Sequence, residues 1–512
     1  MSIASKIHPL RHLPTAAFLL SLLCACSFYE YEDNTEEADP VIPTEKYINL
    51  SIVVSSGNES TTRADETTDT PKGGEEGDGR EAGSTRENEV TGITLMLYHD
   101  DEGINTSEDT TIDFIEYYTV SRLQNEESET ETTYPYPTDI EAVYTTGEQL
   151  LKKNIDTDGT YNVIVVANQD LTKKIIAGKT TVKAIRDYEL KSIYEGGCMG
   201  IDAKKFVMSL ETDYEIDFSK LTPERKDNKL VYKLDNIRIE RLAARVDFWM
   251  KGAKYNNTRE GYEYSVKDSE DKFVLTDITP FNLYNGDEYL FKRITDKNYD
   301  YTSEVPVIYL GKERETANPG DLNYVLSPYI GSKTGTQVPD YMEDYALDYL
   351  LSNDDKYKGT SIHLYDFQTE TEAKFTYPDG EGKEWDNIIL CYPKENTLWK
   401  TTPLYYYATG LCIKGNYYKK GDETPKTLTY YGFIRHQGEF GSGGVYEIMT
   451  EDGLGDYKVY KEEENTIFPM NFGIVRNNIY RISIEEITQK GEIKWQIKVK
   501  KWDKFTHSTI YM

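Results

Sequence analysis

Short stretches of alternating apolar and polar residues, separated by turn residues, recur along this chain of 512 residues. Such alternation is typical of β-strands that bury one face. The sequence has no long segment with the 3.6-residue period of an amphipathic helix. The pattern predicts an all-β protein built from β-sandwiches, with strands at residues 47–54, 93–98, 114–120, 161–166, 206–210, 238–250, 273–278, 388–392, 404–414, 428–435, 478–484 and 492–500.

The strands fall into two groups that meet near residue 250, which predicts two domains. Residues 47–250 form an N-terminal β-sandwich domain and residues 251–512 a C-terminal one. A chain of this length provides enough residues for two cores, since domains usually contain about 100–200 residues. We expect small helices at residues 150–154 and 183–194 and insertions on the second domain between residues 285 and 383.

Tyrosine is unusually abundant, with 43 Tyr against 16 Phe. Tyrosine favours strands and tolerates half-exposed surfaces, so this count agrees with wide β-sheets that contact water. The formal net charge is −31, and the acidic residues are spread along the chain. Such a surface repels phosphate groups, so we expect no nucleic-acid partner.

The N-terminus has the pattern of an export signal. Lys6 and Arg11 precede an apolar run at residues 16–23 that is shorter than the roughly 20 residues needed to span a bilayer. The run ends in Leu23-Cys24-Ala25-Cys26, which resembles the lipobox of bacterial lipoproteins. That resemblance implies a signal peptide at residues 1–25, a lipid on Cys26 and attachment to the outer membrane through the lipid. The alternative is an ordinary cleaved signal.

Two polar segments follow. Residues 26–46 are rich in Glu, Asp and Pro and predict an acidic tether. After the strand at 47–54, residues 55–89 are rich in Ser, Thr, Gly and acidic side chains and predict a flexible loop. Arg63, Arg80 and Arg86 lie in this loop, where a protease would find exposed chain.

The sequence offers no metal site and no cofactor site. Three cysteines remain beyond the signal, Cys198, Cys391 and Cys412, and none lies in a metal-binding spacing. Whether Cys391 and Cys412 pair is left open. Nucleophile-elbow, zinc-protease, Walker and dinucleotide-binding motifs do not occur, and no catalytic carboxylate pair can be singled out among 89 acidic residues. We therefore expect a protein that is not an enzyme.

Five segments, in this order along the chain, resemble the fimbrillin family, the type V pilins of some Gram-negative bacteria. They are residues 53–64, which end in Thr-Thr-Arg-Ala; residues 161–168, Tyr-Asn-Val-Ile-Val-Val-Ala-Asn; residues 239–248, Ile-Glu-Arg-Leu-Ala-Ala-Arg-Val-Asp-Phe; residues 391–397, Cys-Tyr-Pro-Lys-Glu-Asn-Thr; and residues 475–482 with 497–502.

The resemblance implies two transthyretin-like β-sandwich domains in a surface-exposed subunit of a fimbrium. It also implies an Arg-specific protease that removes the N-terminal strand, after Arg63 or, as second choice, Arg86. Other fimbrial subunits would be the partners, because a strand from a neighbour would fill the vacated groove by β-augmentation. The loop that carries these arginines is longer than the family pattern, which leaves the choice between them open.

The donor strand implied by this mechanism is the C-terminal segment. Its apolar row, Ile493, Trp495, Ile497 and Val499, alternates with polar residues and predicts a strand with one buried face. The same strand could instead complete its own domain. A surface glycan-binding lipoprotein is the alternative function, since it would share the signal and the aromatic residues.

Overall fold

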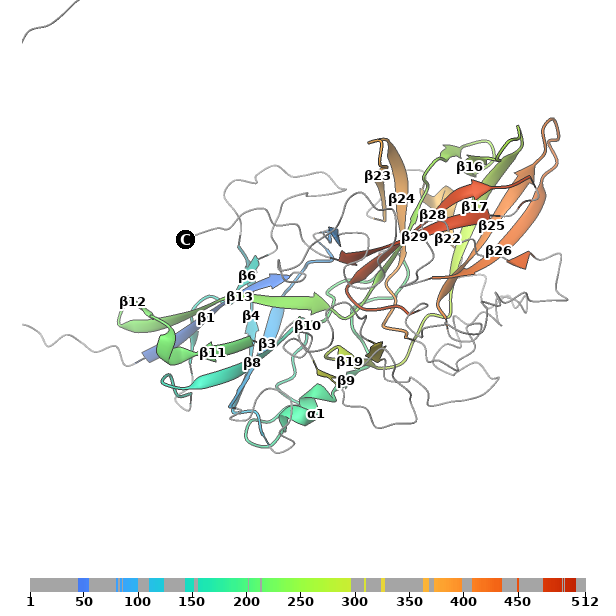
Figure 1. The fold of residues 1–512 in the computed structure, drawn as a ribbon. Helices are drawn as coiled ribbons and strands as arrows, with labels where there is room; N and C mark the ends of the chain where they lie inside the picture. The colour runs from blue at the N-terminus through green and yellow to red at the C-terminus, as the bar shows by residue number, and fades with distance from the viewer. Residues whose placement is uncertain are drawn as a thin grey trace, which may run out of the picture. The chain divides into compact units, whose positions relative to one another are not determined.

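In the computed structural model, secondary structure is described for part of the chain. The described residues are 45–54, 80–81, 83–84, 86–99, 110–123, 143–151, 155–200, 202–211, 214–295, 308–309, 324–326, 362–367, 373–397, 408–434, 449–450, 473–489, 491 and 493–502. Nearly all the regular structure there is β, which confirms the predicted all-β fold (Figure 1).

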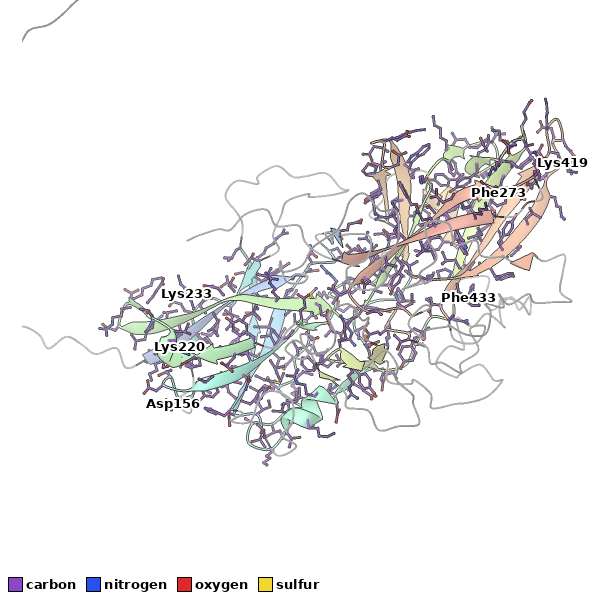
Figure 2. The ribbon with its side chains drawn as sticks, in the orientation of Figure 1. Asp156, Lys220, Lys233, Phe273, Lys419 and Phe433 are labelled. Atoms are coloured by element: carbon purple, nitrogen blue, oxygen red, sulfur yellow. The ribbon has the colours of Figure 1, made fainter. Side chains whose placement is uncertain are left out.

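The first sheet is built from strands that precede residue 242. Its main path runs β4-β3-β8-β10-β13-β1-β6-β5, while β11 pairs with β8, β12 with β13 and β7 with β1. The strand bounds are β1 Glu45–Val54, β3 Gly92–Tyr98, β4 Phe114–Thr119, β5 Ser121–Arg122, β6 Val143–Thr145, β7 Gln149–Leu150, β8 Thr160–Ala167, β10 Met208–Leu210, β11 Tyr214–Asp217, β12 Glu224–Lys226 and β13 Lys229–Arg241. Asp156, Lys220 and Lys233, labelled in Figure 2, belong to this part of the chain.

Two further sheets are built mainly from strands that follow residue 244. One has the order β2-β29-β28-β14-β24-β23, and the other has the order β15-β16-β17-β25-β26-β27, with β22 paired to β17. The bounds of the six-stranded sheet are β2 Arg80–Glu81, β14 Arg245–Trp249, β23 Lys374–Pro378, β24 Glu384–Cys391, β28 Asn478–Ile487 and β29 Ile493–Trp502. Those of the seven-stranded sheet are β15 Lys254–Asn256, β16 Gly261–Ser265, β17 Lys272–Phe281, β22 Ile362–His363, β25 Gly410–Tyr418, β26 Lys426–Phe433 and β27 Met449–Thr450.

Small elements complete the described structure. β9 Glu189–Leu190 pairs with β18 Glu288–Tyr289, and β19 Arg293–Thr295 pairs with β20 Ile308–Tyr309 and β21 Tyr324–Leu326. The 3-10 helices are η1 Phe218–Lys220 and η5 Leu364–Phe367, and the α-helix is α1 Val182–Arg186. The Thr181 side chain caps α1 by accepting a hydrogen bond from the backbone N–H of Ala184.

The six- and seven-stranded sheets pack face to face around one apolar core. Val246 and Phe248 of β14, Ile482 of β28, and Phe273 and Ile413 of the facing sheet are all 0 % exposed and share this core. Phe273 is labelled in Figure 2. Such interdigitation of two inner faces defines a β-sandwich. The first sheet contributes to a separate core cluster.

A glycine fixes the contact between the two facing sheets. Trp495 of β29 crosses the place where Gly432 of β26 lies, and a Cβ at Gly432 would come within 1.5 Å of Cζ2 of Trp495. Glycine at position 432 therefore makes room for the largest side chain of this core.

The expected and observed elements differ most clearly in three places. The strand expected at residues 238–250 is two strands, β13 and β14, because the chain passes from one sheet to another at residues 242–244. The helix expected at residues 150–154 is wrong in its described part, since Leu150 belongs to β7 and pairs with Tyr47 of β1. The helix expected at residues 183–194 is shorter, since it ends at Arg186 and β9 follows.

Candidate functional site

The N-terminal strand β1 lies inside the first sheet. It runs parallel to β13, from Glu45 opposite Lys229 to Val54 opposite Ile239, and antiparallel to β6 and β7 on its other side. Both edges of the strand are thus hydrogen-bonded along part of their length. Figure 1 shows β1 next to β13.

Alternate residues of β1 enter the first core. Ile48, Leu50 and Ile52 are 0 % exposed and Val54 is 2 % exposed. Burial of four such side chains contributes about 1.5–3 kcal/mol each. The N–H of Leu50 also donates to Oγ1 of Thr146 at 3.0 Å. The strand is therefore an integral part of the core although it precedes the long segment at residues 55–79.

The C-terminal strand β29 is paired within its own sheet. It runs antiparallel to β28, with Ile497 opposite Ile482 and Val499 opposite Tyr480. Ile493 and Trp495 are each 2 % exposed, Val499 is 5 % exposed, and Ile497 packs against the same core. The structure thus brings all four candidate donor residues together, within the sandwich of their own chain.

Of the predicted lipidation and processing residues, Arg86 lies in the part of the chain that the structure describes. Cys26 and Arg63 lie outside the described residues. Arg86 lies in a tight turn, where Nη2 donates to Oη of Tyr392 at 3.0 Å and Nη1 donates to the carbonyl of Ala203. Residues 55–89 were expected to form one flexible loop, but Glu87 and Asn88 are buried. Composition could not show this burial because the partners of these residues lie far away in the sequence.

Five charged residues meet on one face of the six-stranded sheet and form the first charge cluster. Its members are Glu81, Glu87, Arg245, Asp247 and Arg481, each 7 % exposed or less. Glu81 accepts from Nη2 of Arg245 and from Nη1 and Nη2 of Arg481, each at 2.7 Å. Glu87 accepts from Nη1 of Arg245 at 3.2 Å. Asp247 accepts from Nε of Arg245 at 2.9 Å and from Nη2 of Arg481 at 2.9 Å.

The alternation of the strands explains this face. Arg245 and Asp247 point away from Val246 and Phe248, which enter the sandwich core. A carboxylate that accepts from a guanidinium at two oxygens makes a strong, directional contact. Burial opposes the charged form of Glu87, but Arg245 and hydrogen bonds from Tyr392 and Ser84 outweigh burial and lower its pKa. The contacts of Glu87 therefore favour its charged form.

A second charge cluster surrounds Arg476. Its other members are Glu240, Glu288, Lys292 and Glu395, each 5 % exposed or less. Nη2 of Arg476 donates to Oε1 of Glu288 at 2.7 Å, and Nε of Arg476 donates to Oε2 of Glu395 at 3.0 Å. The backbone N–H of Glu395 donates to Oε2 of Glu288 at 3.0 Å, and Nζ of Lys292 donates to Glu240 at 3.0 Å.

Two carboxylates of this cluster, those of Glu288 and Glu395, share the guanidinium of Arg476. Burial raises the pKa of Glu288 well above its usual value, and the adjacent Glu395 adds to this effect against the opposing charge of Arg476. Burial also raises the pKa of Glu240, which Lys292 and Arg476 only partly offset. Both shifts have the same main cause, which is burial that the neighbouring cations only partly offset.

Sequence reasoning missed both clusters, although most of their residues lie in segments that had been singled out. Arg245 and Asp247 occupy every second position of an alternating strand, and this regular spacing is the signal that was available. An alternating charge in a strand usually faces water. Nothing in the sequence identifies Glu81 as the partner of Arg481, which lies 400 residues away.

Cys391 and Cys412 do not form a disulfide with each other, and they lie in different core clusters. The described residues contain no group of three side chains that could hold a metal ion. They also contain no helix with the length and hydropathy needed to cross a membrane.

No protein-family model matches the chain, and no curated protein matches it. Solved structures do. A candidate cell adhesion protein from Parabacteroides distasonis is 12 % identical, with coverage of 92 % of this chain and 100 % of that chain and a TM-score of 0.36. A fimbrilin from Porphyromonas gingivalis is 13 % identical, with coverage of 90 % and 99 % and a TM-score of 0.36. The tip fimbrial protein Mfa3 from the same species is 11 % identical, with coverage of 88 % and 99 % and a TM-score of 0.33.

These are the classes of protein that the five sequence segments predict.

Proposed function

We propose that this chain is a structural subunit of cell-surface fimbriae and that it serves adhesion. The observation that carries the proposal is the position of β1. This strand is the first of the described chain, it lies inside the first sheet, and residues 55–79 separate it from the next paired residues. Loss of such a strand would leave the edges of β13 and β6 open above an apolar floor, and an open edge of this kind demands another strand.

Proteolysis is the proposed trigger for the loss of β1. An Arg-specific protease would cut after Arg63, which the sequence places nine residues beyond the end of β1. Arg86 is the weaker choice because its guanidinium is engaged with Tyr392 and Ala203. Lipid on Cys26 would hold the precursor at the outer membrane until it is cut.

A strand from a neighbouring subunit is the proposed replacement for β1. The row formed by Ile493, Trp495, Ile497 and Val499 has the alternation that the groove requires. In this chain the row already fills its own core, so donation would require β29 to leave β28. The residues that follow Trp502 are the other source of a C-terminal donor.

The experiment uses the full chain purified without its lipid, as a Cys26→Ala variant. Trypsin at a limiting dose should cut after Arg63 and convert the monomer into detergent-resistant polymers. A synthetic peptide with the sequence of β1, Glu45–Val54, should block the conversion by occupying the groove. A matched peptide with Lys in place of Leu50 and Ile52 should have no effect. A cut chain that stays monomeric without the peptide would refute the proposal.

Truncation identifies the donor. A chain that ends before Ile493 should either fold and fail to polymerise, which supports the donor row, or fail to fold, which assigns the row to its own core. Normal polymerisation of the truncated chain would exclude the C-terminal segment as donor. Binding of the intact chain to surface polysaccharides, with no polymer after cleavage, would favour a glycan-binding lipoprotein instead.

A further inference from the structure

Residues 80–81, 83–84 and 86–88, called residues 80–88 below, lie beside the six-stranded sheet and precede β3 in the chain. Arg80 and Glu81 extend that sheet as β2, which runs parallel to the end of β29, with Glu81 opposite Trp502. The Glu81 carboxylate accepts hydrogen bonds from both Arg245 and Arg481 at 2.7 Å. The segment therefore supplies an acidic side chain to a sheet whose other strands begin more than a hundred residues later in the sequence.

The same segment is also fixed to the first sheet. Nε of Arg241, on β13, donates to the carbonyl of Glu87 at 3.0 Å. Oη of Tyr144, on β6, donates to the carbonyl of Asn88 at 2.8 Å. These donors belong to the two strands that flank β1, so residues 80–88 contact both sheets at once.

A local turn holds the segment in shape. The backbone N–H of Asn88 donates to the carbonyl of Ser84 at 3.0 Å, and that of Ser84 donates to Oε2 of Glu87 at 2.6 Å. Asn88 Nδ2 donates to the carbonyl of Gly83 at 2.9 Å. The peptide bond that follows Arg86 lies inside this turn, and a protease must open the turn to extend the chain.

We propose that residues 80–88 are a clamp that ties the first sheet to the six-stranded sheet and that stays in the chain when β1 is released. Glu81 and Glu87 are the residues that close the clamp, since each accepts from Arg245. The clamp slows cleavage after Arg86, because a protease must open the turn that contains this bond before it can cut. Release of β1 rests on the proposed function, whereas the tie between the first sheet and the six-stranded sheet does not.

The clamp determines how fast trypsin cuts after Arg86 in the folded chain. When opening is fast and reversible, cleavage follows the population of the open form. Breaking a buried ion pair by removal of one partner raises that population about a hundredfold. In the full-length Cys26→Ala chain, Glu81→Gln should therefore raise the rate of cleavage after Arg86 about a hundredfold. The matched control is Glu270→Gln, since Glu270 pairs with Lys420 at an exposed position, and it should leave that rate unchanged.

Hydrogen exchange of the unmutated chain tests the clamp without any variant. The amides of Glu87 and Asn88 should exchange as slowly as those of β14. Fast exchange at these two amides, or equal rates of cleavage after Arg86 in the Glu81→Gln variant and the parent chain, would overturn the proposal.

The N-terminus of the mature chain on cells separates this proposal from the proposed function. A mature chain that begins before Arg80 supports both. One that begins at Glu87 refutes retention of the clamp and leaves the fimbrial role intact. A chain that is never cut refutes the proposed processing, while hydrogen exchange and trypsin still decide whether the clamp exists.

Discussion

The two charge clusters each contain three acids and two cations, but they differ in how the cations contact the acids. The first places Arg245 and Arg481 between Glu81, Glu87 and Asp247, and the pKa of Glu87 is lowered. The second places Arg476 between Glu288 and Glu395, and the pKa of Glu288 is raised well above its usual value. The difference shows that burial alone does not decide ionisation, because the arrangement of the cations around each carboxylate also matters.

Loss of an arginine from the first cluster should have the largest effect on the free energy of unfolding. Arg481→Met removes the cation that donates two hydrogen bonds to Glu81 at 2.7 Å, and it leaves that carboxylate with Arg245. We expect the free energy of unfolding at pH 7 to fall by about 3–5 kcal/mol. Urea unfolding measures the change. Arg225→Met, at an exposed position of β12, is the control, and an equal loss in both variants would contradict the role of Arg481.

The next effect in size is the loss of the Glu87 charge. Glu87→Gln should lower the free energy of unfolding by about 1–3 kcal/mol at pH 7, since it weakens a charged hydrogen bond with Arg245. Because the folded pKa of Glu87 is lowered, its contribution is present above the ordinary glutamate pKa of about 4.3 and is lost as the pH falls through the folded value. Unfolding curves at several pH values should show the variant and the parent chain converging in acid. A constant difference across pH would contradict ionisation of Glu87.

Glu288→Gln should give the opposite trend with pH. The folded pKa of Glu288 is raised, so the stability that its neutral form provides is fully present below about pH 4.3 and is lost as the pH rises through the folded value. The parent chain should therefore lose stability relative to the variant as the pH rises, by at most about 1.4 kcal/mol for each pH unit in that window. Parallel curves for the two proteins would show that the pKa of Glu288 is not raised in the folded chain.

The smallest effect is expected at an exposed pair. Lys420 and Glu270 lie 2.6 Å apart, but both side chains are more than half exposed. Water and salt screen such pairs. Lys420→Met should leave the melting temperature of the protein unchanged within error in differential scanning calorimetry. A clear loss would mean that the contrast between buried and exposed pairs is overstated.

The sequence was a good guide wherever alternation had its usual meaning. β1, β3, β8 and β28 were expected within two or three residues of their ends, because their apolar rows face a core. The passage between β13 and β14 was missed, since Leu242, Ala243 and Ala244 are apolar and continue the pattern without a turn residue.

The buried charges could not be predicted for a different reason. Periodicity reports which face a residue occupies, but it does not report what covers that face. Arg245 and Asp247 lie on the face opposite the sandwich core, and the cover comes from Glu81 and Glu87, within a segment whose composition is that of a soluble loop. Pairing between residues so far apart in the sequence leaves no local signal.

The parallel pairing of β1 with β13 also affects how the chain folds. Glu45 meets Lys229, and Arg80 and Glu81 meet Lys501 and Trp502 near the other end of the described chain. Contacts of such high sequence separation give a large contact order, and folding slows as contact order rises because long loops must close before they are stabilised. β1 has no complete binding site until β13 has been synthesised, and β2 has none until β29 has been synthesised. β1 must therefore wait for β13, and β2 must wait for β29, so the nascent polypeptide needs protection from aggregation until these strands have been made.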